Sequence, residues 1–359
     1  MDISHDAAKK QRAAAVSGNG TGSIGVALAA AGRNILADAR RGLIAPDLSP
    51  AQAVHEIRKA LKRWRALMRL LAPILGEPAD LMRREAREMM RNLASARDAQ
   101  ACLDALDDLR KSDTELSPTS MATIQDRLAA LKAQAEAQSF SGATRDQLSR
   151  YLDDALLTLE RWPLADIAFP AIADALAVTY RRARQIVPDD WNKADADHLH
   201  DLRRRVVEHR HQMELIEHLW PRLGRLWTEE AQRLRNRLGA CQDLFVFHQM
   251  TARNQPLAPW RSRLAPAIAA RREAHIRAAA RLADRLFAEK PKAFRRRIAK
   301  LWDNRVSAGE DANTAVVKPA KAVRSKPIKS SRKAGAPPTQ NGPKPPVTKT
   351  PRKPGQSAS

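Results

Sequence analysis

Apolar and polar residues alternate along the chain with the period of an α-helix, most clearly in residues 54–75, VHEIRKALKRWRALMRLLAPIL. At about 100° of rotation per residue, the apolar side chains of this segment fall on one face of a helix. The opposite face carries no acid and consists of His55, Arg58, Lys59, Lys62, Arg65 and Arg69. This pattern predicts a helix with one face in a hydrophobic core and a basic face directed away from it.

The same pattern returns 145 positions later, without a gap, in residues 199–216, LHDLRRRVVEHRHQMELI. His55 aligns with His200, and the register continues downstream, where Asp98 aligns with Asp243. An ungapped match of this length indicates an internal duplication of a helical unit. The second basic face consists of His200, Arg203, Arg204, Arg210 and His211.

Proline, glycine and polar segments divide the rest of the chain into further helices. Helices are predicted at about residues 25–43, 50–75, 79–110, 118–138, 141–161, 170–187, 198–220, 226–251, 260–288 and 291–305. Residues 188–197 are polar and separate two halves, at about 24–187 and 198–305. The predicted fold class is therefore all-α, with two pseudo-symmetric helical bundles produced by the duplication.

Both ends of the chain differ in composition from the predicted helices. Residues 1–23 are small, polar and glycine-containing, and residues 306–359 are rich in lysine, proline, serine and alanine. Such segments bury too little apolar surface to offset the entropy lost on ordering. We therefore expect a disordered leader, a folded domain over residues 24–305 and a disordered basic tail.

The chain has a formal net charge of +23, of which residues 306–359 contribute +9 and the remainder +14. The folded region is thus basic in its own right, which favours binding to polyanions. A run of about 20 apolar residues is absent, so no membrane span is predicted. The N-terminus has no compact signal-peptide core, and both cysteines lie inside predicted helices, so we expect a cytoplasmic protein.

The residue patterns that support catalysis or metal binding are absent from the sequence. There is no His-Glu-x-x-His pattern or cysteine pair for a metal, and the arginines around the histidines oppose a divalent cation. No serine or cysteine has an identifiable base, and no acidic cluster suggests a magnesium-dependent phosphohydrolase. The sequence therefore predicts a protein that is not an enzyme and has neither a metal nor a cofactor.

The basic faces have two interpretations, a solvated surface and an anion-binding site. A solvated helix face usually carries acids that pair with its cations at a spacing of four residues. The first basic face has none, so anion binding is the favoured interpretation. In the second face, Val207 and Glu214 replace Lys62 and Arg69, which makes the first half the more basic.

Two further features of the predicted helices bear on such a site. Asp98 and Asp243 either orient the basic side chains or form structural salt bridges or helix caps, and the two roles are compatible. Tryptophan faces can stack nucleobases. Trp64, Trp220 and Trp227 lie on apolar faces, however, so core packing is the favoured role for them.

Residues 54–75 and 199–219, each followed by a helix containing LASARDAQ or LGACQDLF, resemble the CHAD family, the conserved-histidine α-helical domain. The resemblance covers about residues 25–305. It implies two helical bundles around a basic cleft or pore that binds inorganic polyphosphate, and association with polyphosphate granules. By this resemblance, the residues that line the site are His55, Arg58, Lys59, Lys62, Arg65, Arg69, His200, Arg203, Arg204, Arg210 and His211. The supporting residues are Arg97, Asp98 and Asp243.

The second repeat departs from the family pattern. Gln242 stands where the family usually has arginine, Val207 where it usually has a cation, and Glu214 lies on the basic face. The second half of the site is therefore expected to bind more weakly. Some family members carry a triphosphate tunnel metalloenzyme domain, whose Glu-x-Glu-x-Lys strand is absent here, so no hydrolase activity is implied.

The leading hypothesis is a non-enzymatic protein that binds inorganic polyphosphate and is thereby targeted to polyphosphate granules. The alternative is a nucleic-acid-binding or nucleoid-associated protein that binds DNA through the tail of residues 306–359. The two hypotheses combine if the domain holds polyphosphate while the tail places the granule beside the nucleoid. The sequence indicates no oligomeric state.

Overall fold

Every regular element in the described part of the chain is a helix, which confirms the predicted all-α fold class. The computed structural model describes residues 23–93, 97–112, 117–139 and 141–314. No residue in these ranges belongs to a strand. The predicted leader, except Ser23, and residues 315–359 of the predicted tail lie outside the described residues.

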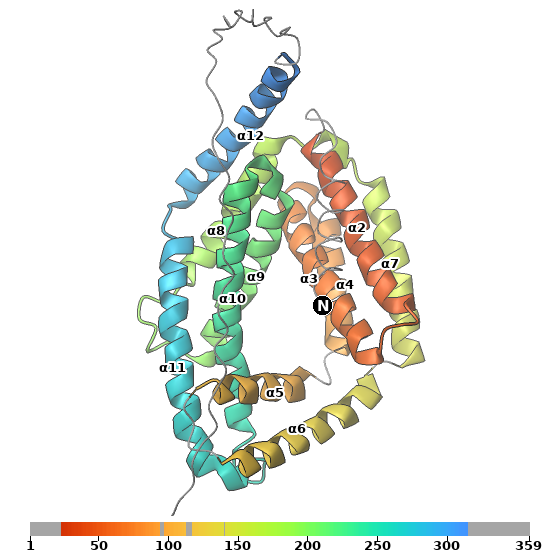
Figure 1. Cartoon of the computed structure of the whole chain (residues 1–359). Coiled ribbons are helices and arrows are strands. Elements are labelled where there is room, and N and C mark those ends of the chain that lie inside the picture. Colours follow the sequence, from red (N-terminus) through yellow and green to blue (C-terminus); the bar gives the residue numbers. More distant parts are fainter. Residues whose placement is uncertain (1–22, 94–96, 113–116, 140, 315–359) are drawn as a thin grey trace, which may run out of the picture. The chain divides into compact units, whose positions relative to one another are not determined.

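The helices keep close to the predicted boundaries in most of the chain (Figure 1). The α-helices are α2 (Ile24–Ile44), α3 (Pro50–Leu75), α4 (Glu77–Asn92), α5 (Arg97–Arg110), α6 (Pro118–Ser139), α7 (Gly142–Arg161), α8 (Phe169–Gln185), α9 (Ala196–Leu215), α10 (Pro221–Gln249), α11 (Arg261–Leu286) and α12 (Pro291–Thr314). Three short 3-10 helices are η1 (Leu164–Asp166), η2 (Glu217–Leu219) and η3 (Ala258–Trp260).

Several predicted boundaries were wrong. The helix predicted over residues 198–220 ends at Leu215, and the helix predicted to begin at residue 226 begins at Pro221. The helix predicted over residues 79–110 is two helices, because Arg58 binds carbonyl groups at the end of α4 and α5 then packs against α10. The tail was predicted to begin at residue 306, but the backbone of residues 306–314 continues α12. This segment contains alanine and glutamate, which are good helix formers, and no proline.

The apolar face of α3 lies in the main hydrophobic core, as the sequence pattern predicts. Ile57, Leu61 and Trp64 are fully buried, and α3 packs against α2, α4, α8 and α9. The indole Nε1 of Trp64 donates a 2.8 Å hydrogen bond to the Tyr151 hydroxyl, which in turn donates to the Met82 carbonyl at 3.0 Å. This chain of hydrogen bonds satisfies the buried polar atoms and joins α3, α7 and α4.

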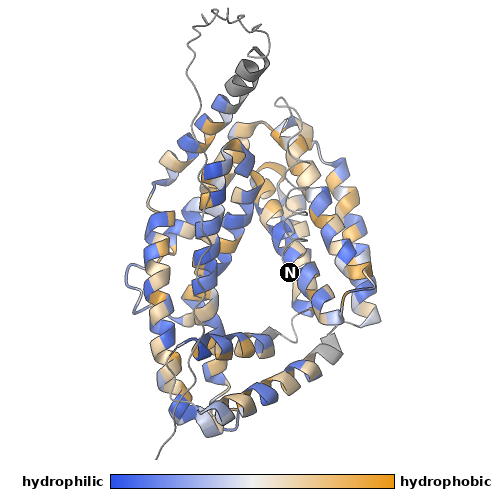
Figure 2. Ribbon diagram, viewed as in Figure 1, coloured by the Kyte–Doolittle hydropathy of each residue, from blue (hydrophilic) through white to orange (hydrophobic). Residues whose placement is uncertain are grey.

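The two helices with predicted basic faces, α3 and α9, pack directly on each other. Gln212 Nε2 donates to the Ala66 carbonyl at 3.0 Å, and Arg69 lies 3.7 Å from a carboxylate oxygen of Glu208. Residue numbers rise along α9 as they fall along α3, so the helices run antiparallel. Figure 2 shows hydrophilic and hydrophobic positions interleaved along these helices and α10.

A second hydrophobic cluster joins helices from the two predicted halves. Cys102, Leu106 and Leu109 of α5 pack with Phe247 of α10 and Leu264 of α11, at the end of the bundle where α5 lies (Figure 1). Helix α5, which belongs to the first predicted half, therefore packs with helices of the second predicted half.

An ion network reinforces this junction of α5, α10 and α11. Both oxygens of Asp108 accept hydrogen bonds from Arg271, at 2.9 and 2.6 Å. His275 Nε2 donates to Asp108 at 2.7 Å, and Arg237 donates to His275 Nδ1 at 3.2 Å. These partners hold the pKa of Asp108 well below its usual range although burial opposes the shift. The buried carboxylate is therefore ionised and paired across the two halves.

Candidate functional site

Among the described residues, arginines from four helices gather around Arg65 and Arg69, together with the carboxylate of Glu208. We call this group of arginines the arginine cluster, and its members are Arg65 and Arg69 of α3, Arg83 and Arg87 of α4, Arg182 of α8, and Arg204 and Arg205 of α9. Arg65 and Arg69 are half-buried, whereas Arg87, Arg182 and Arg204 are exposed. The cluster therefore extends from the contact between α3 and α9 out to solvent.

Arg65 and Arg69 occupy the inner part of the arginine cluster. Burial is the main cause of a lowered pKa for both, neighbouring arginines lower it further, and Glu208 opposes the shift. The Nε atoms of both side chains are buried and have no hydrogen-bond partner among the described residues. Buried polar atoms are nearly always hydrogen-bonded in proteins, so these two donors are suited to a bound anion or water.

Carboxylates neutralise part of the arginine cluster. Arg83 pairs with Asp80 at 2.8 Å and Arg204 with Asp201 at 3.0 Å. Glu208 lies 3.4 Å from Arg205 and 3.7 Å from Arg69. Arginines still outnumber these carboxylates, so the cluster has an excess of positive charge that a polyanion would neutralise.

The first predicted basic face is divided by the fold. Arg65 and Arg69 join the arginine cluster, but His55 is exposed about 15 Å before Arg65 along the helix. Arg58 donates hydrogen bonds to the carbonyls of Met90 and Leu93 at 2.7 and 3.0 Å, and so caps the end of α4. The two remaining cations are also engaged: Lys59 pairs with Glu56 at 3.2 Å, and Lys62 is half-buried with an interaction partner.

The second predicted basic face is divided in the same way. Arg204 joins the arginine cluster, whereas Arg210 and His211 both bind Glu214, at 2.5 and 2.8 Å. The acid that replaces Arg69 of the first repeat thus neutralises Arg210 and forms a hydrogen bond with His211, whose pKa is lowered by burial although Glu214 opposes the shift. His200 is half-buried and has an interaction partner within the described chain.

The arginines that match in sequence, Arg58 and Arg203, have different surroundings. In the first half the partner helix ends, and Arg58 binds the carbonyls exposed there. In the second half α10 continues through the matching position, and the guanidinium of Arg203 lies 3.4 Å from where a Cβ of Gly239 would be. The guanidinium of Arg203 thus lies against the continuous helix α10. The two halves of the site are therefore not equivalent in structure.

The predicted supporting residues lie near the contact of α5 with α10. Burial raises the pKa of the Cys102 thiol to about 12, and the charges of Asp98 and Asp243 add to the rise. Both carboxylates therefore lie near this thiol, although they are 145 positions apart in sequence. The side chain of Arg97 lies outside the described residues.

Sequence reasoning missed several members of the arginine cluster. Arg83 and Arg87 belong to a polar stripe with a spacing of four residues on α4, and that stripe was the available signal for them. Arg182, Arg205 and Glu208 do not lie on either predicted basic face. They join the cluster because α8 and α9 pack against α3.

His209, two residues before His211, belongs to the core. It is fully buried, accepts a 2.9 Å hydrogen bond from Trp227 Nε1 through its own Nε2, and lies among the rings of Tyr180, Phe287 and Phe294. Burial, and then the charge of Arg297, lowers the pKa of His209 to about 3. His209 is therefore neutral in the folded protein at neutral pH and well below it.

This lowered pKa makes folding stability depend on pH. An unfolded chain protonates His209 below about pH 6.5, while the folded protein keeps it neutral down to about pH 3. Stability is therefore complete above pH 6.5 and falls on acidification, by about 2.5 kcal/mol between pH 6.5 and 4.5. Urea denaturation of the wild type and His209→Gln across this range measures the effect, and the Gln variant should show a much smaller decline.

The matched control is His248→Gln, because His248 is exposed. This variant should keep the wild-type dependence on pH. An equal decline in the wild type and His209→Gln would contradict the assignment of the pH dependence to His209.

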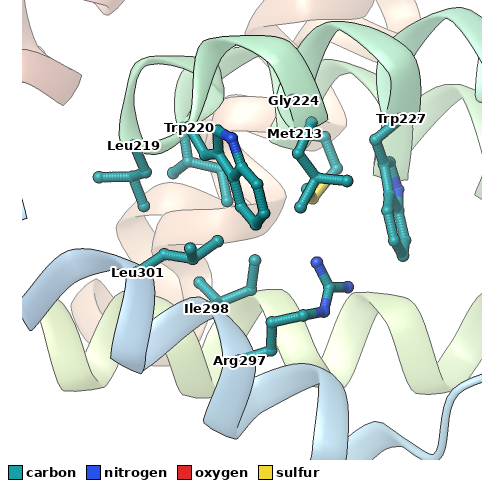
Figure 3. A pocket seen from close by; sticks show the side chains of 10 residues that line it. Met213, Leu219, Trp220, Gly224, Trp227, Arg297, Ile298 and Leu301 are labelled. Carbon is teal, nitrogen blue, oxygen red and sulfur yellow. The ribbon is translucent and has the colours of Figure 1, made fainter. Parts of the chain in front are cut away.

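A small pocket near this core is apolar and does not resemble an anion site. Trp220, Leu223 and Ile298 are among its lining residues, and Figure 3 shows the Arg297 guanidinium beside Trp227. The guanidinium carbon of Arg297 lies 4.7 Å from the centre of the Trp227 ring, and Arg297 also pairs with Glu289 at 2.8 Å. Arg297 is thus held by an aromatic ring and a carboxylate.

Metal ligands and membrane-spanning segments were sought throughout the described ranges. These ranges contain no group of three or more His, Cys, Asp or Glu side chains that could hold a metal ion. None of their helices is both long and apolar enough to cross a membrane.

Comparison with known proteins identifies a domain family and a similar fold. The sequence model of the CHAD domain matches residues 27–252. The crystal structure of the CHAD domain from the plant Ricinus communis is similar, with a TM-score of 0.51 and 20% sequence identity. The match covers 76% of this chain and 92% of the plant chain. No curated protein sequence matches.

Proposed function

The chain belongs to the CHAD domain family, and from this premise we propose that it binds inorganic polyphosphate through the arginine cluster and acts by binding, without catalysis. One observation carries the assignment of the site. Arg65 and Arg69 lie partly buried among further arginines, with more cations than carboxylates, and their Nε atoms have no hydrogen-bond partner among the described residues.

The chemistry of polyphosphate suits this arrangement. Polyphosphate carries about one negative charge per phosphate at neutral pH, and it has no nucleobases that a protein could recognise. Arginine binds phosphate oxygens with two parallel N–H donors and stays charged when partly buried. Helix packing fixes the backbone positions of these arginines on α3, α4, α8 and α9, and the side chains of Arg65 and Arg69 are half-buried. Less conformational entropy is therefore lost when phosphates bind these two side chains.

Location in the cell is part of the same proposal. A protein that binds polyphosphate in the cytoplasm would collect at polyphosphate granules without a further targeting signal.

The basic segment of residues 306–359 favours a second candidate function, the binding of DNA, because it alone contributes +9 to the net charge. Such binding would lie outside the arginine cluster.

The test is a titration of the full-length protein with long-chain polyphosphate at about 0.15 M salt, with double-stranded DNA at equal charge concentration as competitor. Polyphosphate binding is expected to survive the competition. The logarithm of its affinity should fall linearly with the logarithm of salt concentration, with a slope of about −3 to −5 if four to seven arginines contact phosphates. Fluorescence anisotropy of labelled polyphosphate measures both quantities.

The DNA arm of the same titration separates the two candidate functions. If DNA displaces polyphosphate completely at equal charge concentration, binding is nonspecific charge attraction and the proposal fails. Deletion of residues 315–359 tests where each polyanion binds. If the deletion abolishes DNA binding and retains polyphosphate binding, DNA binds to the basic tail and polyphosphate binds to the domain.

A further inference from the structure

We propose that Glu208 is a specificity-determining residue that occupies the arginine cluster as an internal competitor and keeps short phosphate anions out of it. This inference rests on the proposed function of the cluster. It concerns a carboxylate inside the site, where the expected residues are cations.

Glu208 lies where the incoming anion would have to bind. Its side chain is 13% exposed and lies 3.7 Å from Arg69 of α3 and 3.4 Å from Arg205 of α9. Its charge also raises the pKa of Arg65, against the lowering caused by burial. A carboxylate is thus the resident partner of the arginines at the inner part of the cluster.

The first repeat has a different residue at the matching position. Glu208 aligns with Arg63, which points toward α2 and binds Asp38 at 2.6 Å. The helical repeat can therefore be built with either charge at this position. An acid in the second repeat is a feature of the arginine cluster and is not a requirement of helix packing in the duplicated unit.

The contacts of Glu208 are longer than those of the ion pairs that join helices elsewhere. Arg63 with Asp38 and Arg271 with Asp108 both have separations of 2.6 Å. The two distances of Glu208 exceed the usual range for a charge-assisted hydrogen bond, about 2.7–2.9 Å. Phosphate oxygens that approach Arg65 and Arg69 can therefore replace this carboxylate at moderate cost.

This cost falls mainly on a short anion, because a long chain can also bind arginines that Glu208 does not occupy. A short anion reaches only the inner arginines and must displace Glu208 to gain them. A long chain also reaches Arg83, Arg87 and Arg204, which do not depend on Glu208. Glu208 therefore weakens the binding of short phosphates so far that they do not occupy the arginine cluster. Long chains still bind to it.

The experiment compares binding of tripolyphosphate and of long-chain polyphosphate to the full-length wild type, Glu208→Gln and Glu208→Asp. In Glu208→Gln, tripolyphosphate should bind about tenfold more tightly, the equivalent of one lost charged contact. Glu208→Asp keeps the charge but withdraws it by one methylene, so its affinity should lie between the other two. Isothermal titration calorimetry gives the affinities, and thermal melting verifies that each variant is folded.

The matched control is Glu273→Gln, which changes the net charge by the same amount on α11, where Glu273 is exposed and pairs with Arg277. It should change tripolyphosphate affinity less than twofold. If Glu208→Gln binds tripolyphosphate no more tightly than the wild type does, the role of Glu208 is refuted, while long-chain binding by the wild type still supports the proposed function. Absence of long-chain binding in the wild type refutes the proposed function itself.

Discussion

Replacement of both Arg65 and Arg69 by methionine is expected to lower the affinity for long-chain polyphosphate by at least about a hundredfold. A hydrogen bond to a charged group contributes about 1.5–3 kcal/mol, and two arginines lose at least one such contact each. The sum of about 3 kcal/mol corresponds to a factor of more than 100 in the dissociation constant. Anisotropy titrations at constant salt measure this loss directly.

The same double variant should remain folded, because methionine keeps an unbranched apolar stem at each position and removes a partly buried charge. Arg65 has several arginine neighbours and makes no ion pair shorter than 4 Å with a carboxylate among the described residues. Exchange of poorly compensated buried charges for apolar side chains is often neutral or stabilising. The substitution also takes Arg69 away from Glu208, which keeps Arg205 as a partner, so the melting temperature is expected to change little while binding is lost.

The control for this prediction is Arg233→Met with Arg277→Met. Both arginines are exposed, lie on α10 and α11 outside the arginine cluster, and change the net charge by the same amount. They should lower affinity by less than about threefold, since distant exposed charges are screened by salt. Equal losses in the two double variants would show that net charge alone governs binding, and would place the site elsewhere.

Replacement of Trp64 by alanine is expected to destabilise the protein by about 3–5 kcal/mol, the largest effect on stability that we expect from one substitution. Trp64 is fully buried on the face of α3 opposite the cations, at the centre of the main core. The substitution leaves a large cavity. It also removes the indole donor of the Tyr151 hydroxyl, which is buried. Urea denaturation monitored by circular dichroism measures the change in free energy of unfolding.

Two further substitutions separate packing from hydrogen bonding. Tyr151→Phe leaves the indole Nε1 of Trp64 and the Met82 carbonyl without this partner and should cost about 1–3 kcal/mol. Trp220→Ala removes a side chain that is 49% exposed and should cost less than about 1 kcal/mol. A smaller cost for Trp64→Ala than for Tyr151→Phe would contradict the central role of Trp64 in the core.

The fold could be predicted from the sequence wherever local pattern decides the structure. The period of apolar residues identified the helices, and the face of α3 that carries Trp64 is buried as expected. The break between α4 and α5 was missed, because both sides of it have helical patterns. It arises where Arg58 binds the carbonyls of Met90 and Leu93, a contact between residues more than 30 positions apart.

The candidate site could be predicted only in part, for the same reason. The sequence by itself determined that α3 and α9 each have an apolar and a basic face, because a helix places residues on its faces by a fixed rotation. The tertiary structure alone decided which charges of different helices meet. Antiparallel packing of α3 on α9 brings Glu208 to Arg69, 139 positions away, and packing of α3 on α4 gives Arg58 its carbonyl partners. Electrostatic interaction depends on separation in space, and that separation is set by how the helices pack.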